Sequence, residues 1–273
     1  MSQEPHQPFI PAGAELTPEV LREQERRFLE LLEELIAAGE RHGAVMRVIG
    51  SLAFRIKCPD YKHIMYANRR YLTDVDFIAY KKQAAAVQDA FWELGWEENQ
   101  TVLRLFGDKR RIFYHPTQPV HSDIFLDKLA FCHPIDFRGR LELDAPTITL
   151  ADLLLEKLQI VEINKKDLVD VLVLLSAHEV TDEAGSVEAV DGARLAKLCS
   201  KSWGWWRTAT MNLDKLLHFS EEYLEPEQRP VVQERLRRLK EFIDERSKSL
   251  GWHVRSWFGE RFPWYDEVEE VER

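Results

Sequence analysis

The stretch Asp74-Val75-Asp76-Phe77-Ile78-Ala79-Tyr80 alternates acidic and apolar residues at its start and predicts a β-strand. Side chains two residues apart on a strand project to the same face, so the Asp74 and Asp76 carboxylates are expected close together. Two like charges in that position repel each other unless a cation lies between them. Mg²⁺ prefers carboxylate oxygens and completes its coordination with substrate phosphates. The stretch therefore indicates either a metal site or two solvated acids on an exposed edge.

Upstream, the short and partly β-branched run over 45–49 predicts another strand, which ends at Gly50-Ser51. A helix is expected directly afterwards, over 52–57. A glycine and a serine at such a turn let backbone N–H groups and the Ser51 hydroxyl approach a phosphate at the positive end of a helix. Taken alone, the same pair is more typical of an ordinary turn.

Downstream, the run over 120–126 predicts a later strand that carries Asp123. A third acid on a neighbouring strand would complete a site for two metal ions about 3.5–4 Å apart. Asp127 is the competing candidate for that third position. The basic run Lys109-Arg110-Arg111 either touches the phosphates of an acceptor or forms a solvated hairpin.

The remaining pattern divides the chain into two halves. Thr17 and Pro18 are typical of an N-cap and a first helical position, and they begin an amphipathic helix expected to end near Ala38. Another helix is predicted over 83–94, and further strands over 101–106, 111–114, 141–143 and 147–150. From residue 150 onward the periodicity is helical, with helices predicted over 151–163, 165–178, 192–200, 205–219 and 228–247. We therefore expect a flexible tail over 1–16, an α+β domain over 17–148 and a helical domain over 149–273.

Lys157 stands out because its neighbours three and four positions away on the predicted helix are all apolar. A lysine on such a face loses hydration unless it extends its ammonium group to solvent or meets an anion. The candidate anions are a nucleotide phosphate and the Asp167 carboxylate. Asp167 and Asp170 lie three residues apart and either orient Lys157 or stabilise the first turn of their own helix.

Composition limits the function further. The formal net charge of −10 disfavours promiscuous binding to nucleic acid, whose affinity comes mostly from neutralising phosphates. No apolar run approaches the roughly 18 residues that a membrane-spanning helix needs, and the N-terminus lacks the pattern of a signal peptide. The three cysteines are scattered and lack the spacing of a zinc site, which favours a cytoplasmic protein.

The C-terminal part contains a group of tryptophans that can stack a nucleobase or anchor a core or an interface. We favour packing as the role of these residues, which are Trp203, Trp205, Trp206, Trp252, Trp257 and Trp264.

Gly50-Ser51, the Asp-x-Asp strand and a third Asp on a later strand together resemble the signature of the polymerase-β-like nucleotidyltransferase superfamily. Lys157 and the segment Lys166-Asp167-Leu168-Val169-Asp170 are similar to the lysine and K-D-x-x-D segments of its AbiEii-type branch, which includes toxins of toxin–antitoxin systems. Arg69 or Arg70 resembles a basic residue of that branch. The resemblance covers about residues 45–177. It departs from the usual spacing between Ser51 and Asp74, so an insertion near residues 58–68 is expected to loop out.

The resemblance implies a nucleotidyltransferase-like mixed β-sheet domain with flanking helices, followed by a helical C-terminal domain. It also implies transfer of a nucleoside monophosphate from an NTP to an acceptor such as a tRNA, a protein or a small molecule, with Mg²⁺ or Mn²⁺ as cofactor. The alternatives are a binding module without turnover and a toxin held off by an antitoxin protein. In this scheme Asp74, Asp76 and Asp123 are catalytic metal ligands, Lys157 is a catalytic cation, and Gly50, Ser51 and Asp167 contribute to binding the nucleotide.

Overall fold

A computed structural model describes residues 8–11, 13–68 and 71–267 of the chain. The chain divides into two compact units. Unit 1 comprises Met1–Leu129 and Asp136–Ile148, and unit 2 comprises Ala130–Ile135 and Thr149–Arg273. The main division follows Ile148, where the helical periodicity begins, whereas the excursion of residues 130–135 into unit 2 has no sequence signal.

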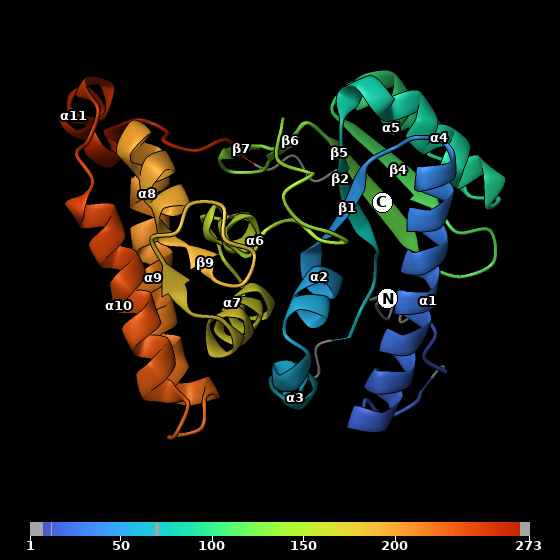
Figure 1. The fold of residues 1–273 in the computed structure, drawn as a ribbon, viewed down its shortest axis with the longest axis horizontal. Coiled ribbons are helices and arrows are strands. Elements are labelled where there is room, and N and C mark those ends of the chain that lie inside the picture. Colours follow the sequence, from blue (N-terminus) through green and yellow to red (C-terminus); the bar gives the residue numbers. More distant parts are fainter. Residues whose placement is uncertain (1–7, 12, 69–70, 268–273) are drawn as a thin grey trace. The chain divides into compact units, whose positions relative to one another are not determined.

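Unit 1 is built on one five-stranded sheet with the strand order β1-β2-β5-β4-β3 (Figure 1). Its strands are β1 (Met46–Ile49), β2 (Asp76–Ala79), β3 (Glu97–Glu98), β4 (Arg110–Tyr114) and β5 (His121–Leu126). β2 and β5 run parallel, and the other neighbours pair antiparallel. The sheet is therefore mixed, and the expectation of a mixed sheet with flanking helices is confirmed.

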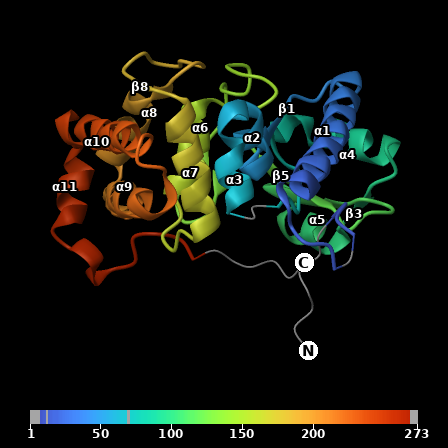
Figure 2. The same ribbon diagram turned by 90° about the horizontal axis from the view of Figure 1, so that it is seen from below.

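Helices α1 (Pro18–Arg41) and α4 (Ala84–Glu93) lie side by side in unit 1 (Figure 2). α1 begins as the sequence predicts, because the Thr17 side chain at the N-cap accepts a hydrogen bond from the Val20 N–H at 3.4 Å. A short 3₁₀ turn, η2 (Lys81–Gln83), leads into α4. Phe91 of α4 stacks on Phe113 of β4 with ring centroids 4.3 Å apart. These aromatic contacts fix α4 on one face of the sheet.

Residues 101–106, predicted as a strand, instead form most of helix α5 (Gln100–Phe106). The Asn99 side chain accepts hydrogen bonds from the Thr101 and Val102 N–H groups, each at 3.0 Å. This N-cap supplies the start signal of a helix, which periodicity alone does not reveal in so short a run. Residues 141–143 form turns, and from the run 147–150 only Thr147 joins the sheet, as a single bridge to Val48.

The segment expected to loop out is also folded. It contains the 3₁₀ turn η1 (Pro59–Tyr61) and α3 (Lys62–Ala67), and it follows α2 (Gly50–Lys57), which confirms the helix predicted over 52–57. A buried polar network ties these elements to Glu25 of α1. Its carboxylate forms an ion pair with fully buried Arg55 at 3.1 Å, accepts a hydrogen bond from the Tyr66 hydroxyl at 2.6 Å, and pairs with Lys62. Arg69 and Arg70, matched to the resembling branch, lie outside the described residues.

Part of the predicted flexible tail is packed. Pro8 and Ile10 are buried, and the Gln24 side-chain amide donates to the carbonyl oxygens of Pro8 at 2.7 Å and of Leu72 at 2.9 Å. The Phe9 ring meets Phe28 of α1 edge to face at 5.3 Å. Residues 8–10 therefore belong to the core of unit 1, while residues 1–7 and 12 lie outside the described residues.

Unit 2 is helical, as the periodicity predicts (Figure 1). Helices α8, α9 and α10 pack against one another, and α6 and α7 pack together beside them. The bounds are α6 (Leu150–Leu158), α7 (Lys165–Ala177), α8 (Gly192–Lys201), α9 (Trp203–Tyr223), α10 (Arg229–Glu245), α11 (Leu250–Ser256) and the 3₁₀ turn η3 (Gly259–Arg261). α6 is shorter than predicted, because residues 160–164 form a turn rather than a further turn of helix.

Two small sheets complete the described structure. One pairs β6 (Lys128–Ala130) with β7 (Pro134–Asp136), and the other pairs β8 (Val180–Thr181) with β9 (Val190–Asp191). Within residues 8–11, 13–68 and 71–267, no helix is both long enough and apolar enough to cross a bilayer.

Candidate functional site

The predicted acids of unit 1 lie on one face of the sheet. Asp76 stands opposite Ile49 of β1, and the parallel pairing of β2 with β5 sets Phe77 against Ile124, so Asp76 and Asp123 occupy neighbouring positions. Val75 and Phe77 are fully buried towards the other face, whereas Asp74 and Asp76 are half-buried. The alternation read from the sequence therefore holds here, and both acids of the Asp-x-Asp motif share a face.

Asp76 is the centre of this group. Its Oδ1 accepts a hydrogen bond from the Asp123 backbone N–H at 3.0 Å. Gly50 has a φ of +70°, a conformation that glycine adopts without steric cost. A Cβ placed on Gly50 would lie 3.9 Å from Asp76 Oδ2. The end of β1 thus brings the glycine backbone beside the carboxylate.

Ser51 occupies the first turn of α2, directly after Gly50. Its side chain is buried, with 5% of its surface exposed, and its hydroxyl has no hydrogen-bond partner among the described residues. The N-cap residue of α2 is Ile49, which has no side-chain oxygen to cap the helix. A buried hydroxyl without a partner costs about 1–3 kcal/mol, which is unusual unless the group serves a ligand. The start of α2 is therefore suited to an anion.

Asp74 lies just before β2 and reaches the sheet through a single bridge to His121. Its Oδ2 accepts a hydrogen bond from the Thr73 hydroxyl at 2.7 Å. A hydroxyl donor at this carboxylate orients it and adds no opposing charge. The Asp74 carboxylate therefore lies on the shared face with a neutral hydrogen-bond donor beside it.

Asp123 differs from the other two acids because it forms a bidentate ion pair. Arg110 donates from Nε to Oδ1 at 3.2 Å and from Nη2 to Oδ2 at 2.7 Å, while its guanidinium lies 5.3 Å from the centre of the Phe125 ring. The Asp123 side chain is 1% exposed and that of Arg110 is 16% exposed. The Arg110 guanidinium therefore balances the charge of the third acid, whose side chain is buried on this face of the sheet.

The rival candidate, Asp127, has a local structural role. It adopts a φ of +62° directly after β5, and its Oδ1 accepts a hydrogen bond from the Lys81 backbone N–H at 3.0 Å. Arg111, next to Arg110 in the sequence, pairs with buried Glu98 instead of facing an acceptor. Arg110 of the basic run reaches Asp123, a role that the sequence did not predict.

The donor set suits one divalent ion better than the predicted pair of metals. Asp74 and Asp76 share a face and are accessible, and Mg²⁺ often takes one or two carboxylates together with substrate phosphates. Both oxygens of Asp123 face Arg110, so the three-carboxylate cluster is not assembled. Consistently, within the part of the chain that the structure describes, no group of three or more acidic, histidine or cysteine side chains is arranged to hold a metal ion.

Lys157 lies in α6 of unit 2 and is surrounded by acids. Its ammonium group lies 3.1 Å from Asp167 Oδ1, 3.2 Å from Glu156 Oε1 and 3.4 Å from Asp170 Oδ2. All four side chains are almost completely buried. α7 begins at the Asn164 N-cap, whose side chain accepts from the Lys166 and Asp167 N–H groups.

Lys157, Asp167 and Asp170 thus come together, which is one of the two arrangements that the sequence left open. The anion that the buried lysine requires is supplied by these carboxylates, so its burial does not by itself indicate a nucleotide phosphate. The binding role expected for Asp167 stays a prediction.

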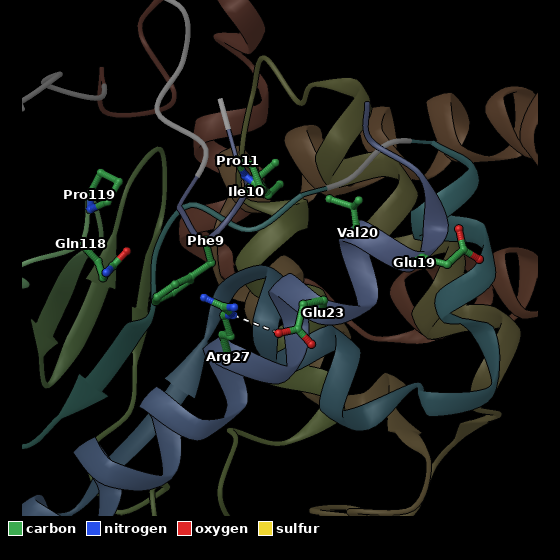
Figure 3. Close-up of a pocket in the computed structure, with 9 residues that line it drawn as sticks. All are labelled: Phe9, Ile10, Pro11, Glu19, Val20, Glu23, Arg27, Gln118 and Pro119. Atoms are coloured by element: carbon green, nitrogen blue, oxygen red, sulfur yellow. Dashed lines mark hydrogen bonds and ion pairs between the residues drawn. The ribbon is translucent and has the colours of Figure 1, made fainter. Parts of the chain in front are cut away.

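Unit 1 also contains a pocket of about 590 Å³ beside the start of α1 (Figure 3). Its wall combines apolar side chains with the ion pair between Glu23 and Arg27, whose closest atoms are 3.0 Å apart. The lining residues are Phe9, Ile10, Pro11, Glu19, Val20, Glu23, Arg27, Gln118 and Pro119. None of the predicted site residues lines this pocket, so it is distinct from the acidic face.

Comparison of the chain with protein-family models, with curated proteins and with solved structures finds no match. We therefore infer the function of the site from the geometry of unit 1, above all from the positions of Ser51, Asp74 and Asp76.

Proposed function

We propose that unit 1 binds a complex of a nucleoside triphosphate with a divalent metal ion and transfers the nucleoside monophosphate to an acceptor. The observation that carries the proposal is that a group suited to an anion and a group suited to a cation adjoin each other in unit 1. The uncapped start of α2, with the partnerless Ser51 hydroxyl, suits phosphate, and the adjoining Asp76 and Asp74 carboxylates suit a cation. A metal-bound triphosphate presents both charges together.

The residues would divide the work by chemistry. Asp74 and Asp76 would hold Mg²⁺ or Mn²⁺, which would neutralise part of the negative charge of the phosphates. Ser51 would donate its hydroxyl to a phosphate oxygen, and the first backbone N–H groups of α2 would add the favourable helix end. Positioning and electrostatics then account for most of the rate.

Asp123 is suited to accept a proton from the hydroxyl of an acceptor, because it lies next to Asp76 on the same face. This role requires its ion pair with Arg110 to open, since both carboxylate oxygens accept hydrogen bonds from the guanidinium. Arg110 would then be free to contact a phosphate, for which its planar donors are well suited.

A second candidate, binding of a nucleotide without turnover, is favoured by the same ion pair. If Asp123 keeps Arg110 throughout, the site retains two acids for one cation and lacks a third acid for chemistry. Binding and transfer must therefore be measured separately.

The test compares wild type with the double variant Asp74→Asn/Asp76→Asn, and uses Asp127→Asn as a matched control at the end of the neighbouring strand. Titration calorimetry with each NTP and Mg²⁺ measures binding, and labelled NTPs with a cell extract reveal transfer. We expect the double variant to lose both while melting no earlier than wild type, because two close like charges are removed. Unchanged transfer by the double variant refutes the metal site. Binding without transfer by wild type establishes the second candidate.

A further inference from the structure

The outer face of α11 in unit 2 is apolar and exposed. Leu250, Val254 and Trp257 follow the i, i+4, i+7 spacing of one helix face and are 86%, 52% and 80% exposed. Trp252, on the opposite side of the helix, packs its ring edge against Trp206 at 5.3 Å. The helix is therefore attached through one face and presents its other apolar face to solvent.

Two phenylalanines extend this face beyond the helix. Phe258 and Phe262 are 46% and 57% exposed, and their ring centroids lie 5.6 Å apart. We call the set the α11 platform, which consists of Leu250, Val254, Trp257, Phe258 and Phe262. Monomeric proteins seldom expose a contiguous apolar area above a few hundred Å², and larger ones mark interaction surfaces.

The α11 platform is held in a defined shape by polar contacts beneath it. Arg255 donates to the carbonyl oxygens of Gly259 at 2.7 Å and Phe262 at 2.8 Å. The Ser249 N–H donates to the Ser200 carbonyl oxygen at 2.9 Å, which attaches the start of α11 to the end of α8. A surface already ordered in this way loses little conformational entropy when a partner binds it.

The charges around the α11 platform discriminate between partners. Residues 244–267 contain five acidic and four basic side chains, and the whole chain has a net charge of −10. An anionic membrane or a nucleic acid requires a predominantly basic surface, whereas acids outnumber bases in this segment. A second copy of the same chain suits a rim of mixed sign, because a two-fold axis can set the acids of one copy against the bases of the other.

We propose that the α11 platform is a two-fold interface between two copies of this chain. Its five side chains expose several hundred Å², on the order of the apolar centre that each partner contributes to an interface of standard size. Trp257 is the principal anchor, since tryptophan is enriched among the residues that dominate binding energy.

The experiment measures molar mass by light scattering and sedimentation over a range of micromolar concentrations. Wild type is expected at twice the 32.0 kDa of the chain. Leu250→Asp and Trp257→Asp, made separately, are expected to raise the dimer dissociation constant by about 30-fold or more, as loss of an anchoring residue does. The matched control is Leu105→Asp on α5 of unit 1, where the leucine is 67% exposed and lies outside the platform.

Because the altered side chains are exposed, each variant is expected to melt at the temperature of the wild-type monomer. A wild-type mass of 32.0 kDa throughout the range overturns the proposal, as does a dimer that neither platform variant weakens. Vesicles of phosphatidylserine and phosphatidylcholine and a single-stranded oligonucleotide complete the test. Binding of wild-type monomer to either of them, lost in both platform variants, assigns the surface to that partner and also overturns the dimer.

Discussion

Replacing Arg110 by Met tests whether Asp123 can serve as a metal ligand. The substitution keeps much of the aliphatic stem and removes the charge, which leaves the Asp123 carboxylate unpaired at 1% exposure. Removing one partner of a buried ion pair costs about 3–5 kcal/mol, because the remaining charge is desolvated without compensation. At about 2–4 °C for each kcal/mol in a unit of this size, the melting temperature should fall by roughly 10 °C.

A divalent ion should recover part of this loss if Asp123 joins Asp76 in coordinating it. A ligand present at about 100 times its dissociation constant stabilises the folded state by about 2.7 kcal/mol, over half of the largest expected loss. The control is Arg110→Met combined with Asp123→Asn, which removes the unpaired charge and the metal ligand together. This double variant should melt higher than Arg110→Met without metal and gain less from Mg²⁺.

Thermal melts of wild type, Arg110→Met and the double variant, each with and without Mg²⁺, decide the question. The expected result is the largest Mg²⁺-dependent rise in Arg110→Met. An equal rise in all three proteins would show that the metal does not use Asp123 and would leave proton acceptance as the role proposed for this acid. A melting temperature of Arg110→Met equal to that of wild type would refute the energetic reasoning itself.

Two further variants test the buried polar networks. Lys157→Met should lower the free energy of unfolding in urea by about 3–5 kcal/mol, because three buried carboxylates lose their cation; unchanged stability would show that the acids are neutralised in another way. Burial opposes the charged form of Glu25, but hydrogen bonds from Lys62 and Tyr66 and the charge of Arg55 outweigh it and hold the Glu25 pKa below its usual value. A lowered folded-state pKa stabilises the protein above the unfolded-state pKa, and this contribution is lost as the pH falls through the folded-state pKa. Glu25→Gln should therefore be less stable than wild type near neutral pH, with a difference that shrinks below about pH 4; a difference independent of pH would assign the loss to packing.

Much of unit 1 was predictable because its signals are local. Thr17 and Pro18 cap and start α1 through contacts within one turn, and the alternation over 74–80 gives both the strand and the shared face of its acids. The helical periodicity of unit 2 follows from short-range spacing in the same way. Such features need no knowledge of distant partners.

The predictions that were wrong concern elements whose structure depends on a helix cap or on a distant partner. Asn99 makes residues 101–106 helical although their apolar pattern also suits a strand. The segment after α2 is folded because Glu25, some forty residues upstream, supplies a buried partner for the Tyr66 hydroxyl. The spacing of a known motif suggested a loop there, since spacing carries no information about such a partner.

The sequence predicted which residues of unit 1 come together at the candidate site, but it did not predict the ion pair that one of them forms. Gly50, Asp76 and Asp123 meet as expected, but the ion pair of Asp123 with Arg110 follows from the antiparallel register of β4 and β5. That register sets Ile112 against Asp123 and brings position 110 within reach of the carboxylate. A strand prediction gives the face of a residue but not its cross-strand neighbour, so the sequence left the basic run as either a contact for acceptor phosphates or a solvated hairpin.

The charges on the shared face impose an order of binding under the proposed function. The shared face carries the Asp74, Asp76 and Asp123 carboxylates, which attract a cation and repel a bare triphosphate. The start of α2 offers favourable dipoles, but these amount to about half of one charge and cannot offset two carboxylates. A nucleotide is therefore expected to enter together with its divalent ion or after it. A bound cation would also compete with Arg110 for the negative charge of the acids and would weaken the ion pair between Asp123 and Arg110. Binding of the cation therefore favours the state in which Arg110 contacts a phosphate.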